Sequence, residues 1–200
     1  RDFIISISFE ILVHTCSSKT SPSASSSFCT IPSSDSINNS DTWSIKRKLT
    51  TSLSKEDKED KPPLLYDLTE LQRDANLSYG FSAKETLDTL QRLYEVHKIV
   101  TYPRTDSRYL TSDIVPTLKD RVRALSNSDF SPVAKAFLEN GYSFDTDRYV
   151  QEALVSDHHA IIPTEEMVRP EKLSNDELRL FKLIALRFLE ALCEPYKYTT

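Results

Sequence analysis

Seven consecutive residues, 101–107, carry the side chains best suited to chemistry. They read Thr-Tyr-Pro-Arg-Thr-Asp-Ser and so place a phenol, a guanidinium, hydroxyls and a carboxylate around one proline. The phenol oxygen of Tyr102 could attack a phosphodiester while Arg104 holds the phosphate oxygens through paired hydrogen bonds. Because Pro103 restricts the backbone between them, the two groups would be held in place. The alternative is that Tyr102 only packs on the core at the end of an extended segment.

A second polar cluster contains two adjacent histidines, His158 and His159, within Ser-Asp-His-His-Ala-Ile-Ile-Pro-Thr at 156–164. Neighbouring side chains point apart on a helix or a strand, so an adjacent pair rarely binds one ion. A tetrahedral site also needs further ligands at a useful spacing, and the nearby sequence supplies none. We therefore predict no metal site here. The alternative to a functional role is a histidine that forms hydrogen bonds within a polar loop.

Both clusters resemble motifs of the type IA DNA topoisomerases, in particular the bacterial topoisomerase III group. The first matches the family's active-site motif at 102–107, with the bacterial Asp-Ser ending. Further matches follow in order over residues 62–110, through PPLLYDLTELQRDAN, GFSAKETL, LYE and SRYL. The resemblance implies that Tyr102 is the nucleophile and forms a 5′-phosphotyrosyl link to single-stranded DNA. It also implies that Arg104 stabilises the phosphate, and that His158 contacts it or tunes proton transfer.

The resemblance also indicates contacts to single-stranded DNA beyond these three catalytic residues. The predicted DNA-binding residues are Arg73, Lys98, Asp106, Ser107, Arg108 and His159. Basic residues that could line a DNA groove are Arg73, Lys84, Arg92, Lys98 and Arg108, and most of them lie on charged faces of expected helices, where an ordinary solvated side chain is the alternative. Leu154 stands where the family more often has a basic residue, a departure that would weaken a phosphate contact.

The resemblance covers about residues 62–200 and implies partners that belong to the same enzyme. Type IA enzymes carry an N-terminal Toprim domain, whose acidic cluster binds Mg²⁺, and further segments that complete a toroidal gate. Residues 1–61 hold no Asp-x-Asp-x-Asp cluster, so we expect Mg²⁺ in the full-length enzyme and none bound by this fragment. The chain begins with Arg1 rather than Met, and we expect a fragment that is inactive without the Toprim half.

Three functions remain open at this point. The first is ATP-independent cleavage of one DNA strand, passage of another and religation, which changes DNA topology. The second is a non-catalytic DNA-binding or vestigial module that lacks the Toprim half. The third is a tyrosine recombinase, which the order of the motifs disfavours because Tyr102 precedes the histidine pair.

The amino-acid composition narrows the possible functions and the cellular location further. With Gly 2 in the whole chain, no Gly-rich phosphate loop can be written. The net charge of −5 argues mildly against nucleic acid, although a local cationic groove can lie on an acidic protein. The cysteines show no CxxC spacing, which fits a cytoplasmic protein, nucleoid-associated if bacterial. Apolar residues 3–13 are too short to span a bilayer, so we expect no membrane partner.

The elements that must position these residues read as mainly α-helical with a few short strands. This is also the fold class that the catalytic-tyrosine region of the type IA enzymes implies. Residues 1–61 are rich in Ser and end in a charged run, and we expect them to be disordered or unrelated. Residues 62–165 would form the catalytic-tyrosine domain, and 166–200 would begin a neighbouring helical domain.

Local signals predict where the helices begin and end. The expected N-terminal caps are Asp67, Ser82, Ser112 or Asp113, Ser131 and Ser174. Ser82 and Ser174 are each followed three residues later by Glu, which completes a capping box. Pro132 should occupy the first position of its helix, and Gly141 should end it.

Two apolar faces have consequences for the site. The helix after Ser82 should end near His97 and carry on one face Leu87, Leu90, Leu93 and Tyr94. An extended segment at 99–102 would then deliver Tyr102 to a turn. The helix at 174–192 has an apolar face that could remain exposed, and promote aggregation or dimerisation, if its partner is missing. That face consists of Leu178, Phe181, Ile184, Phe188 and Leu192.

Overall fold

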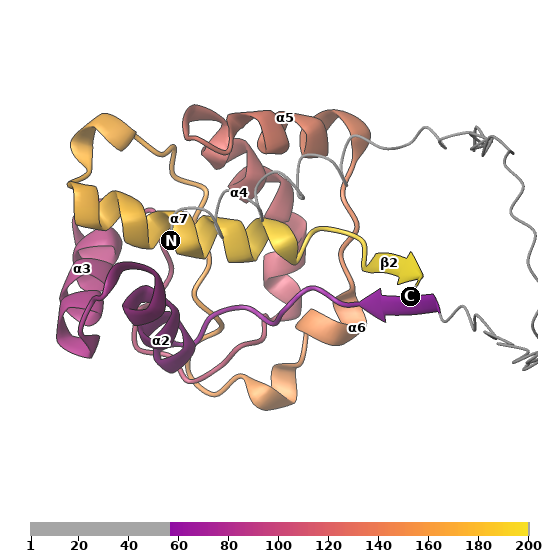
Figure 1. The fold of residues 1–200 in the computed structure, drawn as a ribbon, viewed down its shortest axis with the longest axis horizontal. Helices are drawn as coiled ribbons and strands as arrows, with labels where there is room; N and C mark the ends of the chain where they lie inside the picture. The colour runs from indigo at the N-terminus through magenta and orange to yellow at the C-terminus, as the bar shows by residue number, and fades with distance from the viewer. Residues whose placement is uncertain (1–56, 200) are drawn as a thin grey trace, which may run out of the picture.

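The structure is a computed structural model that describes residues 57–199, and it is mainly helical, as predicted (Figure 1). The helices are α2 (Leu68–Tyr79), α3 (Ala83–Glu95), α4 (Leu118–Ala124), α5 (Ser131–Asn140), α6 (Thr146–Tyr149) and α7 (Asn175–Glu190). Short 3₁₀ turns occur at Ser112–Thr117, Leu125–Asn127, Glu152–Leu154 and Pro170–Lys172. The strands are β1 (Asp57–Asp60) and β2 (Tyr196–Thr199). The disorder predicted before residue 57 lies outside the described residues.

Most helix ends follow the predicted capping signals. The two capping boxes, at the starts of α3 and α7, are both formed. Asp67 caps α2 by accepting a hydrogen bond from the backbone N–H of Glu70. Gly80 ends α2 with a φ of 76°, a left-handed conformation that a residue without Cβ adopts at little cost. These ends were predictable because each depends on residues within one turn.

Two helix starts differ from the prediction. Phe130 holds the cap position of α5 without a side-chain capping hydrogen bond, and Ser131 is the first residue of the helix. The segment after Thr111 begins as a 3₁₀ turn containing Pro116, and regular α-helix follows only from Leu118. Proline lacks an N–H and crowds the preceding turn, which explains why the α-helix starts after it.

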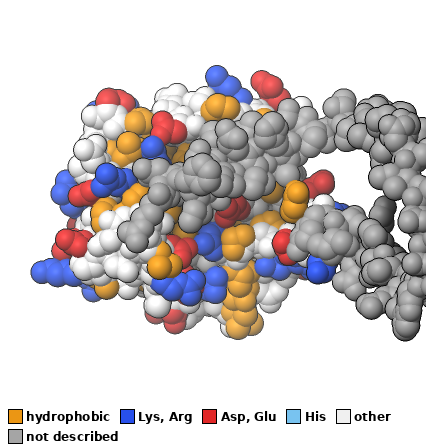
Figure 2. Space-filling view, in the orientation of Figure 1, with side chains coloured by type: hydrophobic (Ala, Val, Ile, Leu, Met, Phe, Trp, Pro, Cys, Tyr) orange, Lys and Arg blue, Asp and Glu red, His pale blue; other side chains and the backbone are white. Residues whose placement is uncertain are grey.

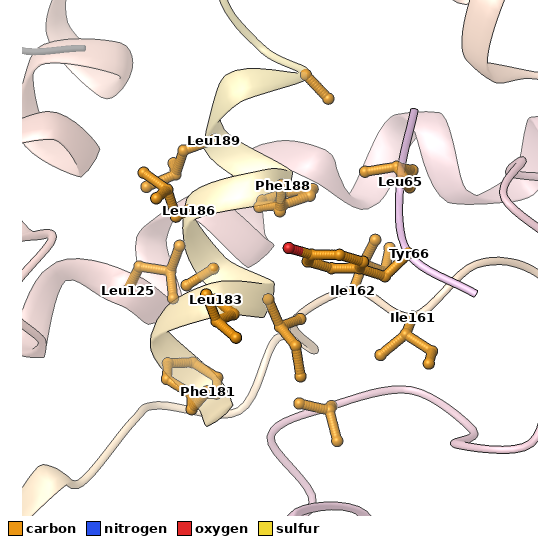
Figure 3. Close-up of a cluster of buried hydrophobic side chains, with 14 of the residues drawn as sticks. Leu65, Tyr66, Leu125, Ile161, Ile162, Phe181, Leu183, Leu186, Phe188 and Leu189 are labelled. Atoms are coloured by element: carbon orange, nitrogen blue, oxygen red, sulfur yellow. The ribbon is translucent and has the colours of Figure 1, made fainter. Parts of the chain in front are cut away.

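Helix α7 lies at the centre of the molecule and contacts both α2 and α3 (Figure 1). Phe181, Ile184 and Phe188 are at most 1% exposed. Figure 3 shows its side chains packed with residues from distant parts of the chain, among them Leu65, Tyr66, Ile161 and Ile162. The expectation of an exposed apolar face on this helix is therefore wrong, because the preceding residues cover it. The domain boundary at residue 165 stays a prediction.

The short strands β1 and β2 pair in an antiparallel ribbon, with Lys58 opposite Tyr198 and Glu59 opposite Lys197. The sequence predicts disorder or weak structure in the charged run that ends at residue 61, and residues 57–60 of that run form β1. Backbone pairing needs no apolar side chains, and the partner strand comes from the far end of the chain. In Figure 1 this ribbon lies at the opposite end of the molecule from α3.

A polar network ties α7 to α2 and to the segment before it. Arg187 donates from Nη2 to Asp74 Oδ2 at 2.8 Å and from Nη1 to the carbonyl of Leu64 at 3.2 Å. Tyr66 donates its hydroxyl to the same Asp74 oxygen at 2.8 Å, and the Arg187 guanidinium lies 4.3 Å from its ring centroid. Burial raises the pKa of Tyr66 above its usual range, so the phenol remains a donor.

A second charged contact joins α3 to the start of α7. The side chain of Glu177 is 2% exposed, and its Oε1 lies 2.9 Å from Arg92 Nε and 3.4 Å from His97 Nε2. Burial alone would raise the pKa of Glu177, but hydrogen bonds from Ser174 and the charges of Arg92 and His97 lower it below its usual value. The ionised carboxylate is therefore the form that the fold stabilises.

Among the described residues, no helix combines the length and apolar character needed to cross a bilayer.

Replacing Phe188 with Ala should lower the free energy of unfolding by about 3–5 kcal/mol, because the ring is buried in the shared core. Leu77→Ala is the control: Leu77 is 64% exposed, so its loss should cost less than about 0.5 kcal/mol. Urea denaturation followed by circular dichroism measures both. Equal effects of the two substitutions would mean that α7 does not share the core.

Glu177→Gln should make stability less dependent on pH in the acid range. Because the folded pKa of Glu177 is lowered, its contribution is complete above the ordinary carboxyl pKa and is lost as the pH falls through the folded value. The stability difference between wild type and Glu177→Gln should therefore be largest near pH 7 and shrink towards about pH 3. Urea midpoints at several pH values test this, and a difference that stays constant would contradict it.

Candidate active site

The candidate site forms where two segments that are distant in sequence run side by side. Val100 and Pro163 form an antiparallel bridge. Thr101 donates its N–H to the carbonyl of Ile162 at 3.0 Å, and Thr164 donates its N–H to the carbonyl of Ile99 at 3.1 Å. The extended conformation predicted for 99–102 is thus stabilised by the histidine-containing segment, which joins the two sequence motifs in space.

Threonine side chains complete this pairing where the backbone cannot. The Thr101 hydroxyl donates to the carbonyl of Ala160 at 3.1 Å and accepts the N–H of Ile162 at 3.0 Å. The Thr105 hydroxyl donates to the carbonyl of His158 at 2.8 Å and accepts the N–H of Ser107 at 3.1 Å. The two hydroxyls flank Tyr102 and fix both segments around it.

The pairing places Tyr102 against His158. Their ring centroids are 4.0 Å apart with an interplanar angle of 34°. Tyr94, on the last turn of α3, approaches Tyr102 from another direction, at 5.6 Å and 90°. Tyr102 is half-buried and His158 is exposed. The nucleophile candidate therefore lies at the surface between two rings, rather than deep in the apolar core.

Arg104 reaches towards α3 rather than towards the tyrosine ring. Its side chain is exposed, and its Nη2 lies 3.5 Å from Oε1 of Gln91. Gln91 in turn donates from Nε2 to Glu95 Oε1 at 2.8 Å. Helix α3 thus contacts both predicted catalytic residues of the Tyr-Pro-Arg segment, Tyr102 through Tyr94 and Arg104 through Gln91.

The two histidines differ in their surroundings. His159 is half-buried and donates from Nδ1 to the carbonyl of Ala160 at 2.8 Å. Burial lowers the pKa of His159, which favours the neutral ring at neutral pH. His158 is the exposed member of the pair and the one in contact with Tyr102.

The predicted DNA-binding residues after Arg104 are mostly engaged within the protein. Ser107 is buried, and its hydroxyl donates to the carbonyl of Leu154 at 3.0 Å. Half-buried Arg108 donates from Nε to the carbonyl of Leu65 at 3.4 Å. Asp106 is exposed and accepts a hydrogen bond from Ser156 Oγ at 3.3 Å. The geometry favours structural roles for Ser107 and Arg108, while DNA contact by any of the three stays a prediction.

The two basic residues predicted to bind DNA before Tyr102 are exposed. Arg73 on α2 pairs with Glu70 and lies 3.7 Å from Asp74. Lys98 has a φ of 57°, uncommon for a residue with a Cβ, and its carbonyl accepts a hydrogen bond from Thr164 Oγ1 at 2.7 Å. The structure brings Lys98, but not Arg73, into the paired segments that hold Tyr102.

Three residues near the site differ from the sequence prediction. Tyr94 was misplaced, and Gln91 and Arg121 were missed. Tyr94 was expected on the apolar face of its helix, yet it is 37% exposed and contacts Tyr102. Gln91 carries no chemical signal of its own. Arg121 is 6% exposed and donates to the carbonyl of Pro163 at 2.8 Å, so a buried charge holds the paired segment. Only the one-turn spacing of Gln91 and Tyr94 could have indicated a shared surface.

Positively and negatively charged side chains are mixed on the protein surface. On the face shown in Figure 2, Lys and Arg side chains lie among Asp and Glu side chains. This agrees with the acidic net charge of −5. Any affinity of this face for a nucleic acid must therefore come from local contacts rather than from one broad basic surface.

Within residues 57–199, no group of three or more His, Cys, Asp and Glu side chains is placed to hold a metal ion. The site of the Mg²⁺ ion that the resemblance implies for the full-length enzyme stays a prediction. The paired segments themselves offer a phenol, a guanidinium and an imidazole, from Tyr102, Arg104 and His158.

Comparison with known proteins identifies the family. The family model described as DNA topoisomerase matches residues 11–200. The chain belongs to this bacterial DNA topoisomerase family. The match extends into the Ser-rich stretch before residue 62, beyond the span on which the sequence resemblance rested.

The curated relatives agree and indicate a type IA, topoisomerase III-like sequence. DNA topoisomerase 3 of Bacillus subtilis is 52% identical over 153 residues, which are 76% of this chain and 21% of the relative. The Bacillus licheniformis protein of the same name is 53% identical over 146 residues, 73% of this chain and 20% of the relative. The chain thus spans about a fifth of the length of these relatives.

A solved structure shares the fold. Full-length topoisomerase I from Thermotoga maritima matches 73% of this chain and 23% of its own length, with a TM-score of 0.50 and 26% sequence identity. The predicted family and the predicted mainly helical fold class are therefore both confirmed.

Thr105→Val should cost about 1–3 kcal/mol of stability, because the carbonyl of His158 and the N–H of Ser107 lose their shared partner. It should also move the His158 ring away from Tyr102, which changes the chemical shifts of the His158 ring protons. Thr105→Ser keeps the hydroxyl and is the matched control. If both variants leave these shifts at the wild-type values, the hydroxyl does not hold His158.

Proposed function

We propose that this chain is the catalytic-tyrosine segment of a type IA topoisomerase III-like enzyme that cleaves and rejoins single-stranded DNA through Tyr102. The observation that carries the proposal is the contact between Tyr102 and His158, at the protein surface and in a chain of this family. Members of the Tyr-Pro-Arg and His-His motifs, 50 residues apart or more, meet at one place. A structural tyrosine would not require that meeting.

The cleavage step is a transesterification. The phenol oxygen of Tyr102 bonds to phosphorus, and the bond from phosphorus to the 3′ oxygen of the preceding nucleotide breaks. The phenol proton leaves, and the departing 3′ oxygen gains one, so the products are a 5′-phosphotyrosine and a 3′-hydroxyl. One phosphate diester replaces another, so the step needs no ATP, and the 3′-hydroxyl can reverse it after another strand has passed.

We assign Arg104 to the phosphate and His158 to the proton. Arg104 is exposed, and its only hydrogen bond to another described side chain is a long one, to Gln91 at 3.5 Å. Exchanging that bond for two charge-assisted bonds to phosphate oxygens is favourable. His158 lies on the Tyr102 ring and is exposed, so it can exchange protons with solvent close to the phenol. His159, Lys98, Asp106, Ser107, Arg108 and Arg73 remain proposed DNA contacts.

The rest of the enzyme would supply the other functions. The chain covers 21% of the Bacillus subtilis relative, so strand passage and religation are proposed for the whole protein. We also propose that its Mg²⁺ is held by carboxylates of a Toprim domain, and that the enzyme acts in the cytoplasm. The remaining alternative is a DNA-binding module without catalysis.

A segment exchange tests the proposal. The aligned part of Bacillus subtilis DNA topoisomerase 3 is replaced by the matching part of this chain and incubated with Mg²⁺ and a single-stranded oligonucleotide. After denaturation, a 3′-labelled oligonucleotide should remain covalently attached to protein, whereas a 5′-labelled one should be released as a shorter fragment. Tyr102→Phe should abolish the adduct, because it removes only the attacking oxygen and keeps both ring contacts.

Controls separate the roles. Tyr109→Phe removes a phenol oxygen from the same segment and should leave the adduct unchanged. Arg104→Lys keeps the charge but loses the paired hydrogen bonds, and should slow cleavage by about 10²–10³-fold. An exchanged protein that folds and binds DNA but forms no adduct would favour the non-catalytic module. An adduct that survives Tyr102→Phe would exclude Tyr102 as the nucleophile.

A further inference from the structure

The last turn of α3 presents a polar and aromatic surface to the candidate nucleophile. Gln91, Tyr94 and Glu95 are spaced three and four residues apart, so they lie on one side of the helix. Gln91 contacts Arg104 and Glu95, and Tyr94 contacts Tyr102. This surface therefore borders both groups that are proposed to act on the phosphate.

Tyr94 is not required for packing in the core. Leu90 and Leu93 are fully buried and supply the contact of α3 with the interior, whereas Tyr94 is 37% exposed. An aromatic ring left partly in water beside a nucleophile has an apolar face available for another flat group. Figure 1 shows α3 at the end of the molecule away from the β1–β2 ribbon, with this helix on the outside.

The charges around Tyr94 indicate which part of a nucleic acid fits there. The side-chain amide of Gln91 contacts Arg104 through its oxygen and the Glu95 carboxylate through its nitrogen. A phosphate would be attracted to Arg104 and repelled by Glu95. A nucleobase is flat and uncharged, and it can stack on Tyr94 beside Glu95 without that repulsion.

The ring geometry permits this without disturbing the nucleophile. Tyr94 and Tyr102 are perpendicular, at 90°, whereas His158 lies on the Tyr102 ring at a tilt of 34°. A base stacked parallel to Tyr94 would stand perpendicular to Tyr102 and leave His158 in place. The 5.6 Å between the tyrosine ring centroids places such a base close to the candidate nucleophile.

We propose that Tyr94 is a base-stacking residue that holds a nucleobase near the scissile phosphate and so positions the strand over Tyr102. This inference rests on the proposed function, because it takes single-stranded DNA as the ligand. The stacking contact would not depend on the DNA sequence, because every base has a flat face.

The test compares two ligands for the whole chain. One is a fluorescent thymidine oligonucleotide, and the other is an oligomer of the same length in which every nucleotide is abasic, so the phosphates remain and the bases are absent. Fluorescence anisotropy gives the two dissociation constants and their ratio. Wild type should bind the thymidine oligomer about 5- to 100-fold more tightly. In Tyr94→Leu the ratio should fall several-fold towards one.

Matched variants show whether the ring itself is responsible. Tyr94→Phe keeps the flat face and should retain the wild-type ratio. Tyr196→Leu removes an exposed tyrosine, 54% exposed, from the opposite end of the molecule and should also retain it. Tyr94→Leu should leave the salt dependence of thymidine binding unchanged, because no phosphate contact is lost, whereas Arg104→Ala should reduce its slope. A general loss of structure in Tyr94→Leu would change both the ratio of dissociation constants and the salt dependence.

The outcomes separate the two proposals. If wild type binds both oligomers but Tyr94→Leu keeps the wild-type ratio, or if wild type shows no preference for the oligomer with bases, the stacking role of Tyr94 is overturned and the proposed function stands. If wild type binds neither oligomer while the segment-exchanged enzyme still forms its Tyr102 adduct, stacking by Tyr94 in this chain is overturned alone. If the adduct is absent as well, the proposed function fails too.

Discussion

The site depends on the pairing of residues 99–105 with 158–164. Neither segment belongs to a sheet, and Pro103 and Pro163 have no N–H to donate, so a regular ladder of backbone hydrogen bonds cannot form. The hydroxyls of Thr101 and Thr105 bond to backbone groups of the partner segment instead. Buried backbone groups must find partners, so these two side chains determine where Tyr102 stands.

Two arginines, one buried and one half-buried, stabilise backbone segments in and next to this part of the fold. Arg121 and Arg187 both donate to backbone carbonyls, of Pro163 and Leu64 respectively, while each is also paired with a carboxylate. Glu177 joins α7 to α3, the helix that borders the site. A guanidinium suits this task because it offers several donors in a fixed plane. The apolar side chains of α7 form the buried core. These charged contacts fix the orientation of the neighbouring segments against that helix.

Features that depend on a few neighbouring residues could be predicted from the sequence, and features that depend on distant partners could not. The capping boxes of α3 and α7 are local, and both were predicted. The partner strand of β1 and the cover on α7 come from far along the chain, so no local pattern revealed them. Periodicity placed Tyr94 on the core side because it follows Leu90 by four residues and Leu87 by seven, but the ring lies at the edge of that helix face and is 37% exposed. The site residues were indicated by family resemblance, since spacing alone left a packing role for Tyr102 open.

The ribbon of β1 and β2 has a consequence for how this unit fits within a longer polypeptide. Neighbouring strands lie about 4.7–4.9 Å apart, so the backbone arrives at and departs from the helical unit at almost the same point. A unit whose two ends are adjacent can be inserted into a longer polypeptide without separating the residues on either side of the insertion.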